Sequence, residues 1–222
     1  MVLNFANLAR AQVNPNAGSN SGPNAGIDQL RQFIKNSKTA EGEFVQQQLR
    51  SPKANEPPDK LKVIRQTSGK FLFQRPGKFV WDTQKPYEQK LLADGKLVTM
   101  WDKDLNQVTI RSAGQALAST PAAILFGESA IDDYFDLEEA GERNELRWVN
   151  LKPKTKAADK NEIPYTKIAI GMGNGLPRGL ELIDGFGNVV LVVFGSMQLN
   201  VNITPGRFVF TPPAGAEVLR LN

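Results

Sequence analysis

Alternating apolar and polar residues run through the middle of this chain, and this period of two predicts β-strands. Two aromatic runs, Phe71-Leu72-Phe73 and Phe79-Val80-Trp81, flank the turn residues Arg75-Pro76-Gly77. Because successive side chains of a strand point to opposite faces, the two aromatic rings of each run share one face. The pattern therefore predicts a wall of aromatic rings beside one arginine. Such a wall suits either an ordinary hairpin core or an apolar pocket.

The rest of the chain repeats this pattern, with turn residues between the strands. Asp94-Gly95 predicts a tight hairpin, and residues 184–188 predict another. Roughly ten or eleven strands with hairpin connections indicate a mainly β fold built from one curved antiparallel sheet.

Two segments depart from the period of two. The apolar residues Ile27, Leu30 and Phe33 recur at helical spacing and predict a short amphipathic helix. Residues 119–127 predict a second short helix, whose middle at 122–126 is wholly apolar and has to lie against apolar surface. A single curved sheet of this size cannot fill its concave face with its own side chains, so short helices covering it would leave an apolar cavity.

Residues 1–26 are rich in Asn, Gly and Ser and predict a disordered tail, followed by one domain over 27–222. This start lacks the basic and apolar regions of a signal peptide, which predicts either a cytoplasmic protein or a mature form whose signal has been removed. No run approaches the ~18 apolar residues of a transmembrane helix.

Composition excludes several chemistries. The 222 residues contain no Cys and no His, which rules out disulfides, thiolate metal sites and Ser-His-Asp or Cys-His catalysis. Neither a metal site nor a cofactor is predicted. The net charge of +4 permits binding to an anionic membrane or to nucleic acid, although acidic and basic residues are interspersed.

Other candidate motifs favour structural interpretations. Gly171-Met172-Gly173-Asn174-Gly175 precedes Leu176-Pro177, which stops any helix, so a turn is a better reading than a phosphate loop. Asp132-Asp133 and Glu138-Glu139 are adjacent pairs that would point to opposite faces of a strand, so neither forms a catalytic dyad. The lysines of 152–160 predict a solvated loop. The chain is therefore not expected to be an enzyme.

Five sequence pieces, in order, resemble the outer-membrane lipoprotein carrier (LolA) family. They are Gly69 with 75–81, Pro86 with 92–96, Trp101–Val108, Thr120-Pro121 and Phe208–Val218. The resemblance spans roughly residues 27–218. It implies an unclosed β-barrel with a helical lid over an apolar cavity for the acyl chains of lipoproteins.

The resemblance also implies roles for residues. Arg75 matches a cavity arginine that bonds to the lid and keeps the empty form shut, and 120–126 matches part of that lid. Val98 and Met100 are preferred inside over Thr99 and Trp101, although a one-residue register slip would invert them. The expected cavity residues are apolar positions of the strands and lid: Phe71, Phe73, Phe79, Trp81, Leu91, Val98, Met100, Ile124, Leu125, Leu180, Leu182, Val190 and Val192.

The function implied by the resemblance is that of a monomeric periplasmic carrier, here in mature form. It would receive acylated lipoproteins from an inner-membrane ABC transporter and deliver them to an outer-membrane receptor lipoprotein. The lack of Cys separates this chain from that receptor, which is anchored through a lipidated Cys. One alternative is a lipid-sensing periplasmic regulatory domain. Another, from a different class, is a basic nucleic-acid-binding module that stacks bases on Trp81, Trp101 and Trp148. Nucleic acid is not an expected partner.

Overall fold

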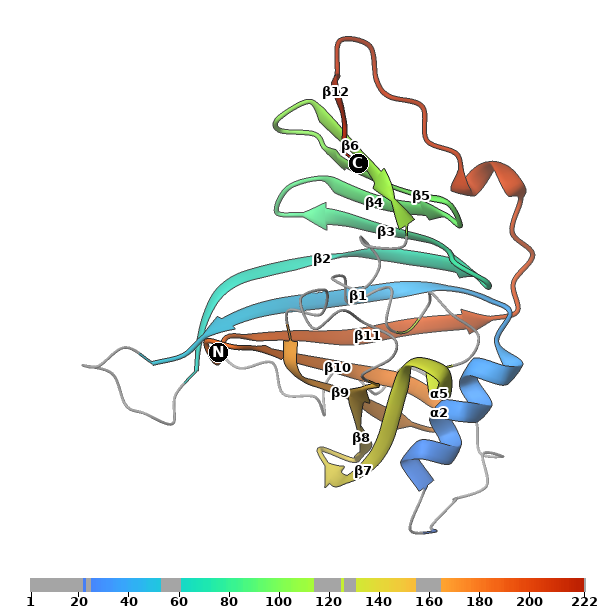
Figure 1. Cartoon of the computed structure of the whole chain (residues 1–222), viewed down its shortest axis with the longest axis vertical. Helices are drawn as coiled ribbons and strands as arrows, with labels where there is room; N and C mark the ends of the chain where they lie inside the picture. The colour runs from blue at the N-terminus through green and yellow to red at the C-terminus, as the bar shows by residue number, and fades with distance from the viewer. Residues whose placement is uncertain are drawn as a thin grey trace. The chain divides into compact units, whose positions relative to one another are not determined.

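The computed structural model describes residues 22, 25–52, 61–113, 125, 131–154 and 165–221 (Figure 1). Twelve strands form one sheet in the order β12-β6-β5-β4-β3-β2-β1-β11-β10-β9-β8-β7, with β12 and β7 as its two edges. The strands are β1 Thr39–Arg50, β2 Lys62–Gln74, β3 Lys78–Lys85, β4 Gln89–Asp94, β5 Leu97–Asp102, β6 Gln107–Ser112, β7 Phe135–Arg143, β8 Leu146–Pro153, β9 Tyr165–Gly173, β10 Leu176–Asp184, β11 Val189–Leu199 and β12 Glu217–Arg220. The described helices are α2 Ala25–Asn36, α5 Ile131–Tyr134 and the 3₁₀ turn η1 Pro205–Phe208.

The predicted mainly β fold with a single unclosed sheet is confirmed. Two details differ. The described residues form twelve strands rather than the predicted ten or eleven, and the last, β12, pairs with β6 in parallel. The parallel direction of β12 is possible because of the segment that connects it to the preceding strand. A hairpin forces neighbouring strands to be antiparallel, whereas β12 follows η1 and an irregular segment and is free to take either direction.

The chain divides into two compact units, which are considered separately below. The first contains α2 together with residues 45–66 and 130–196, and the second contains residues 37–44, 67–129 and 197–222. No described helix is long and apolar enough to cross a membrane.

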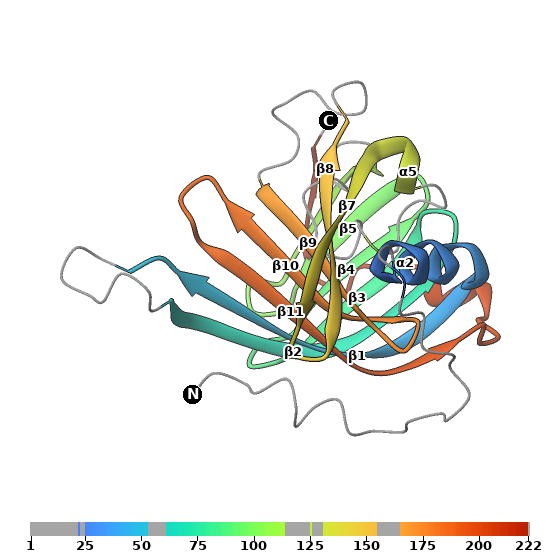
Figure 2. The same cartoon turned by 90° about the horizontal axis from the view of Figure 1, so that it is seen from below.

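In the first unit, α2 packs on strands β7 to β10 (Figure 2). Its buried face includes Ile27, Leu30 and Phe33, which confirms the predicted apolar stripe. The helix begins at Ala25, two residues before the stripe. Ala25 and Gly26 are buried as well.

The glycine-rich segment at 171–175 is strand and turn. Gly171 and Gly173 belong to β9, and positive φ angles at Asn174 and Gly175 make the turn to β10. The reading as a turn is confirmed for these last two residues. The predicted helix at 119–127 lies outside the described residues except for Leu125, which is helical. Of the predicted loop at 152–161, residues 152 and 153 belong to β8, and 155–161 lie outside the described residues.

Candidate functional site

The aromatic runs form one face of the second unit. The aromatic hairpin consists of β2 and β3, which pair so that Phe71 lies opposite Trp81 and Phe73 opposite Phe79. The registers of the next two pairs extend these rows through β4 and β5. One row is Phe71, Trp81, Leu91 and Met100, and the other is Phe73, Phe79, Ala93 and Val98. We call this surface the aromatic face.

A glycine allows the first strand of the hairpin to come close to the second. Gly69 sits at a register shift in the β2–β3 pair, where a Cβ would collide with the main-chain carbonyl of Asp82. Any larger residue would force the backbones apart. Strand β2 runs without a break through 62–74.

Aromatic stacking closes the aromatic face at its β1 side. The ring of Phe44 stacks on the ring of Trp81 with centroids 3.8 Å apart, and the ring centroids of Phe71 and Trp81 are 6.3 Å apart. Phe44 and Phe71 are each 2% exposed, and Trp81 is 8% exposed. These rings are therefore out of water in this form of the molecule.

Arg75 joins three pieces of the second unit. Its Nη2 donates a hydrogen bond to the carbonyl oxygen of Leu125 at 2.7 Å, and its Nε donates to the carbonyl oxygen of Ser37 at 3.2 Å. Its backbone N–H donates to the carbonyl oxygen of Lys38 at 2.9 Å. The guanidinium also lies 4.9 Å from the ring centroid of Phe73, within range for a cation–π contact. We call this set of contacts the Arg75 hub.

The first unit has an aliphatic counterpart to the aromatic face. Across β10 and β11, Leu180 lies opposite Val192 and Leu182 opposite Val190, all on one face. Leu180, Leu182 and Val192 are fully buried, and Val190 is half-buried.

The predicted cavity residues thus fall into two groups, one in each unit. Phe71, Phe73, Phe79, Trp81, Leu91, Val98 and Met100 share the aromatic face, and Leu180, Leu182, Val190 and Val192 share the aliphatic one. Leu125 is 1% exposed and Met100 is 38% exposed. Ile124 lies outside the described residues. Whether these side chains line a cavity stays a prediction, as does the covering lid.

Sequence reasoning missed the partners that organise these residues. Phe44 falls in a predicted strand but was not singled out, although its place in the alternation of β1 could have signalled a buried ring. The acceptors at Ser37, Lys38 and Leu125 are main-chain carbonyls, which every residue type carries. No sequence signal identifies them.

The tryptophans do not form a platform for stacking bases. Trp81 lies under Phe44, and Trp148 is 2% exposed, with its indole N–H donating to the carbonyl oxygen of Arg143 at 3.1 Å. Trp101 packs against Phe210, with ring centroids 6.0 Å apart. Stacking on bases requires open ring faces, so the nucleic-acid alternative is not favoured.

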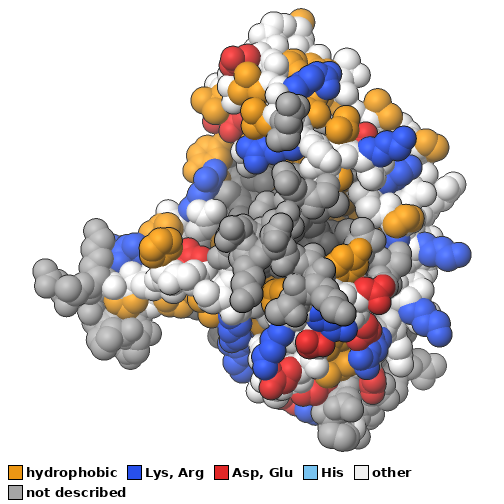
Figure 3. All heavy atoms as spheres, viewed as in Figure 1, with side chains coloured by type: hydrophobic (Ala, Val, Ile, Leu, Met, Phe, Trp, Pro, Cys, Tyr) orange, Lys and Arg blue, Asp and Glu red, His pale blue; other side chains and the backbone are white. Residues whose placement is uncertain are grey.

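Charges of both signs mix on the first unit. Around α2, α5 and β7, Figure 3 shows red and blue side chains side by side. Arg31 of α2 pairs with Asp132 of α5 at 2.7 Å, and the hydrogen bond from Arg31 lowers the pKa of the Asp132 carboxyl. Lys152 pairs with Glu138 at 2.8 Å. One carboxylate of each predicted acidic pair, Asp132 and Glu138, therefore takes part in a structural ion pair.

Comparisons with known proteins agree with the fold. A model of the family described as outer membrane lipoprotein carrier protein LolA matches residues 35–211. An outer-membrane lipoprotein carrier protein of Ralstonia nicotianae is 42% identical over 220 residues, covering 99% of each chain. One from Cupriavidus pinatubonensis is 42% identical over 196 residues, covering 88% of each chain.

Two solved structures resemble the fold at low identity. A LolA superfamily protein of Nitrosomonas europaea has a TM-score of 0.50 and 11% identity, covering 83% of this chain and 96% of its own. An uncharacterized conserved protein of Thermus thermophilus has a TM-score of 0.51 and 14% identity, covering 88% of this chain and 96% of its own.

The family match places the chain, with its one unclosed, mainly β sheet, in the class of carriers rather than enzymes. The chain belongs to the outer membrane lipoprotein carrier protein LolA family.

Proposed function

We propose that this protein carries acylated lipoproteins across the periplasm, with their acyl chains held against the aromatic and aliphatic faces. The observation that carries the proposal is the Arg75 hub. The guanidinium of Arg75 ties Ser37 and Leu125 to the aromatic hairpin through hydrogen bonds to their carbonyl oxygens, and its backbone N–H donates to the carbonyl oxygen of Lys38. Breaking them would free Leu125, and with it the segment predicted as a lid.

The energetics of acyl chains limit how such a carrier works. Burial stabilises by ~0.8 kcal/mol per CH₂, so one sixteen-carbon chain contributes about 12 kcal/mol and three contribute about 36. Noncovalent affinities saturate near about 18–21 kcal/mol. The site would therefore hold the chains incompletely or open at a cost in free energy.

The same free energies imply that partner proteins drive loading and release. A membrane buries acyl chains as well as a protein does, so a passive carrier would gain little by extracting them. An energised donor, the inner-membrane ABC transporter of the resemblance, would drive loading. An outer-membrane receptor lipoprotein with a more favourable site would drive release. The protein would act as a monomer.

The proposal is tested by mixing the purified chain with one lipoprotein in two forms. The first form is triacylated, and the second carries a Cys→Ser change at its lipid-attachment site and has no acyl chains. Native mass spectrometry should find a one-to-one complex with the first form alone. Equal binding of both forms, or of neither, would contradict the carrier function.

A further inference from the structure

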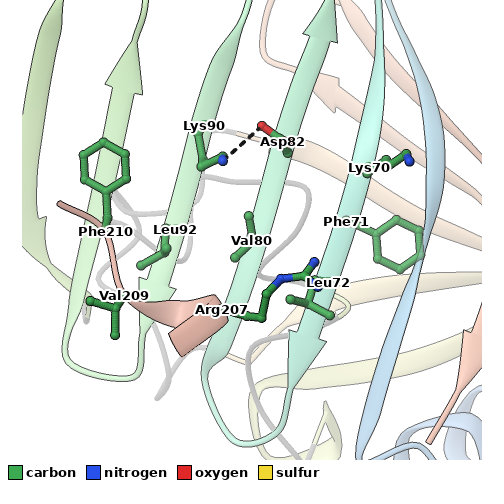
Figure 4. A pocket seen from close by; sticks show the side chains of 10 residues that line it. All are labelled: Lys70, Phe71, Leu72, Val80, Asp82, Lys90, Leu92, Arg207, Val209 and Phe210. Atoms are coloured by element: carbon green, nitrogen blue, oxygen red, sulfur yellow. Dashed lines mark ion pairs between the residues drawn. The ribbon is translucent and has the colours of Figure 1, made fainter. Parts of the chain in front are cut away.

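A pocket lies in the second unit, apart from the hydrogen bonds of the Arg75 hub. It has a volume of about 170 Å³ and lies between strands β2 to β4 and the segment at η1. Figure 4 shows the side chains that line it: Lys70, Phe71, Leu72, Val80, Asp82, Lys90, Leu92, Arg207, Val209 and Phe210.

Strand register puts this pocket on the face opposite the aromatic one. Lys70, Asp82 and Lys90 lie directly across from one another on β2, β3 and β4. Each is adjacent in sequence to a residue of the aromatic face, so its side chain points to the other side of the sheet. Apart from Phe71, which belongs to the aromatic face, the residues of β2 to β4 that line the pocket therefore lie on the face opposite the predicted acyl-chain surface.

The charges in the pocket are unequal. Three cations, Lys70, Lys90 and Arg207, meet one carboxylate, Asp82. Lys90 pairs with Asp82 at 3.7 Å (dashed in Figure 4). Lys70 and Arg207 are exposed and have no ion-pair partner among the residues that the structure describes. The pocket thus holds two uncompensated positive charges that complement an anion.

The remaining lining is apolar. Leu72, Val80 and Leu92 form one row on the sheet, and Val209 and Phe210 approach from the C-terminal segment. Val209 is 70% exposed, which leaves an apolar side chain in water beside Arg207. Apolar side chains bordered by cations are typical of surfaces that contact anionic membranes.

The size of the pocket limits which ligands can fit in it. Its volume of about 170 Å³ is below the ~300–1,000 Å³ of pockets that hold drug-sized molecules. There is room for a charged head group with its first carbons, but not for a whole acyl chain. A guanidinium binds a phosphate through two parallel hydrogen bonds, and an ammonium adds a point charge.

We propose that this pocket binds the phosphate of an anionic phospholipid head group, with Arg207 and Lys70 as its ligands and the exposed Val209 against the glycerol carbons. The site would let the protein touch an anionic membrane surface without using the faces proposed to hold cargo. It goes beyond the carrier function and does not depend on it.

The test titrates the full-length ¹⁵N-labelled chain with dihexanoyl-phosphatidylglycerol below its micelle concentration. NMR signals of residues 207–210 and the indole N–H of Trp101, which packs against Phe210, should shift. Dihexanoyl-phosphatidylcholine, with the same tails and no net charge, should not shift them. Equal shifts from both lipids, or from neither, would overturn the proposal.

Variants test whether phosphatidylglycerol binds in the pocket. Changing Lys70→Gln and Arg207→Gln together should weaken phosphatidylglycerol binding by about tenfold or more, because both charged ligands are lost. The matched control changes Lys96→Gln and Arg220→Gln, two exposed cations of the same unit outside the pocket, and should keep the affinity. An equal loss in both double variants would mean unspecific attraction and would overturn the proposal.

Two further ligands separate the possible sources of the anion. Inorganic phosphate should bind much more weakly than the lipid, because it makes no apolar contact with the exposed Val209. Equal affinity would make the pocket a free-phosphate site and contradict the lipid assignment. An acetylated Leu-Glu-Leu peptide should not compete. If it alone shifts the signals, the pocket docks a protein. Loading with a triacylated lipoprotein is measured separately and should be unchanged in the Lys70→Gln, Arg207→Gln variant.

Discussion

Each unit has one polar attachment: in the first unit it holds the helix α2, and in the second unit it holds the helical residue Leu125. The two attachments differ in the charge of the groups that form them. In the first unit, α2 is attached through full charges. Glu139 accepts a hydrogen bond from the Ile27 N–H at 2.7 Å, and Arg31 pairs with Asp132. In the second unit, the Arg75 hub attaches Leu125 through a neutral carbonyl oxygen. The guanidinium bonds of the hub, each about 1.5–3 kcal/mol, can be exchanged for bonds to water when the segment opens, whereas a half-buried carboxylate that loses its donor stays partly desolvated. The comparison suggests that α2 is fixed and that the Arg75 hub is releasable.

The largest expected effect comes from removing the hub. Arg75→Leu should load lipoprotein normally but transfer it to the receptor about tenfold more slowly or worse. The reason is that hydrogen bonds to a charged group, each about 1.5–3 kcal/mol, no longer favour the emptied form. The measurement is the transfer rate from preloaded protein, with Arg220→Leu as an exposed control. Normal transfer by Arg75→Leu would refute the gating role.

The largest effect on stability, as distinct from transfer, is expected from the stack that closes the aromatic face. Phe44→Ala should lower the free energy of unfolding by about 3–5 kcal/mol, because a fully buried ring is lost from against Trp81. The control is Phe186→Ala, since Phe186 is 87% exposed in the turn between β10 and β11. It should change stability by less than about 0.5 kcal/mol. Urea unfolding compares the two, and similar losses would mean that the Phe44 stack does not stabilise the fold.

The attachment of α2 should give a smaller effect. Glu139→Ala removes the acceptor of one of the first four N–H groups of the helix, together with a negative charge near the positive end of its dipole. The expected loss of stability is about 1–2 kcal/mol. Its neighbour Glu138 forms only an exposed ion pair with Lys152, so Glu138→Ala should cost about 0–1 kcal/mol. Thermal unfolding of both variants measures these losses of stability, and equal losses would contradict a special role for Glu139.

The smallest effect is a dependence of stability on pH. Burial disfavours the charged form of Glu181, but hydrogen bonds from Lys167 and Arg143 outweigh it and hold the pKa of this carboxyl below its usual value. A depressed folded pKa adds stability above the unfolded value near 4.5, and this stability is lost as pH falls through the folded pKa.

The stability difference between the natural chain and Glu181→Gln should therefore shrink as the pH is lowered from 7 to below 4.5. Urea unfolding at several pH values measures it. The exposed Glu43→Gln serves as the control. A difference that stays constant, or that grows toward acid, would show that Glu181 is not stabilised as an anion.

Local patterns predicted the aromatic face well. The alternation in 71–73 and 79–81, with a turn between them, is enough to align Phe71 with Trp81, because a short turn restricts the register of its hairpin. The side-chain faces of β4 and β5 follow from the turn at Asp94-Gly95 in the same way.

Contacts between distant segments could not be predicted in that way. The parallel pairing of β12 with β6 depends on a long connection, and Arg207 reaches strands more than a hundred residues earlier in the chain. Neither leaves a periodic signal. The role of Arg75 was suggested by resemblance alone, since its acceptors are not side chains.

The Arg75 hub also bears on how this protein can change over time. The peptide carbonyls of positions 37, 38 and 125 are present whatever side chains stand there. Substitutions at these three positions therefore leave the acceptors in place, while any replacement of Arg75 removes the side-chain donors at once. In descendants of this chain, mutational drift should be tolerated at the accepting positions and resisted at the donating one.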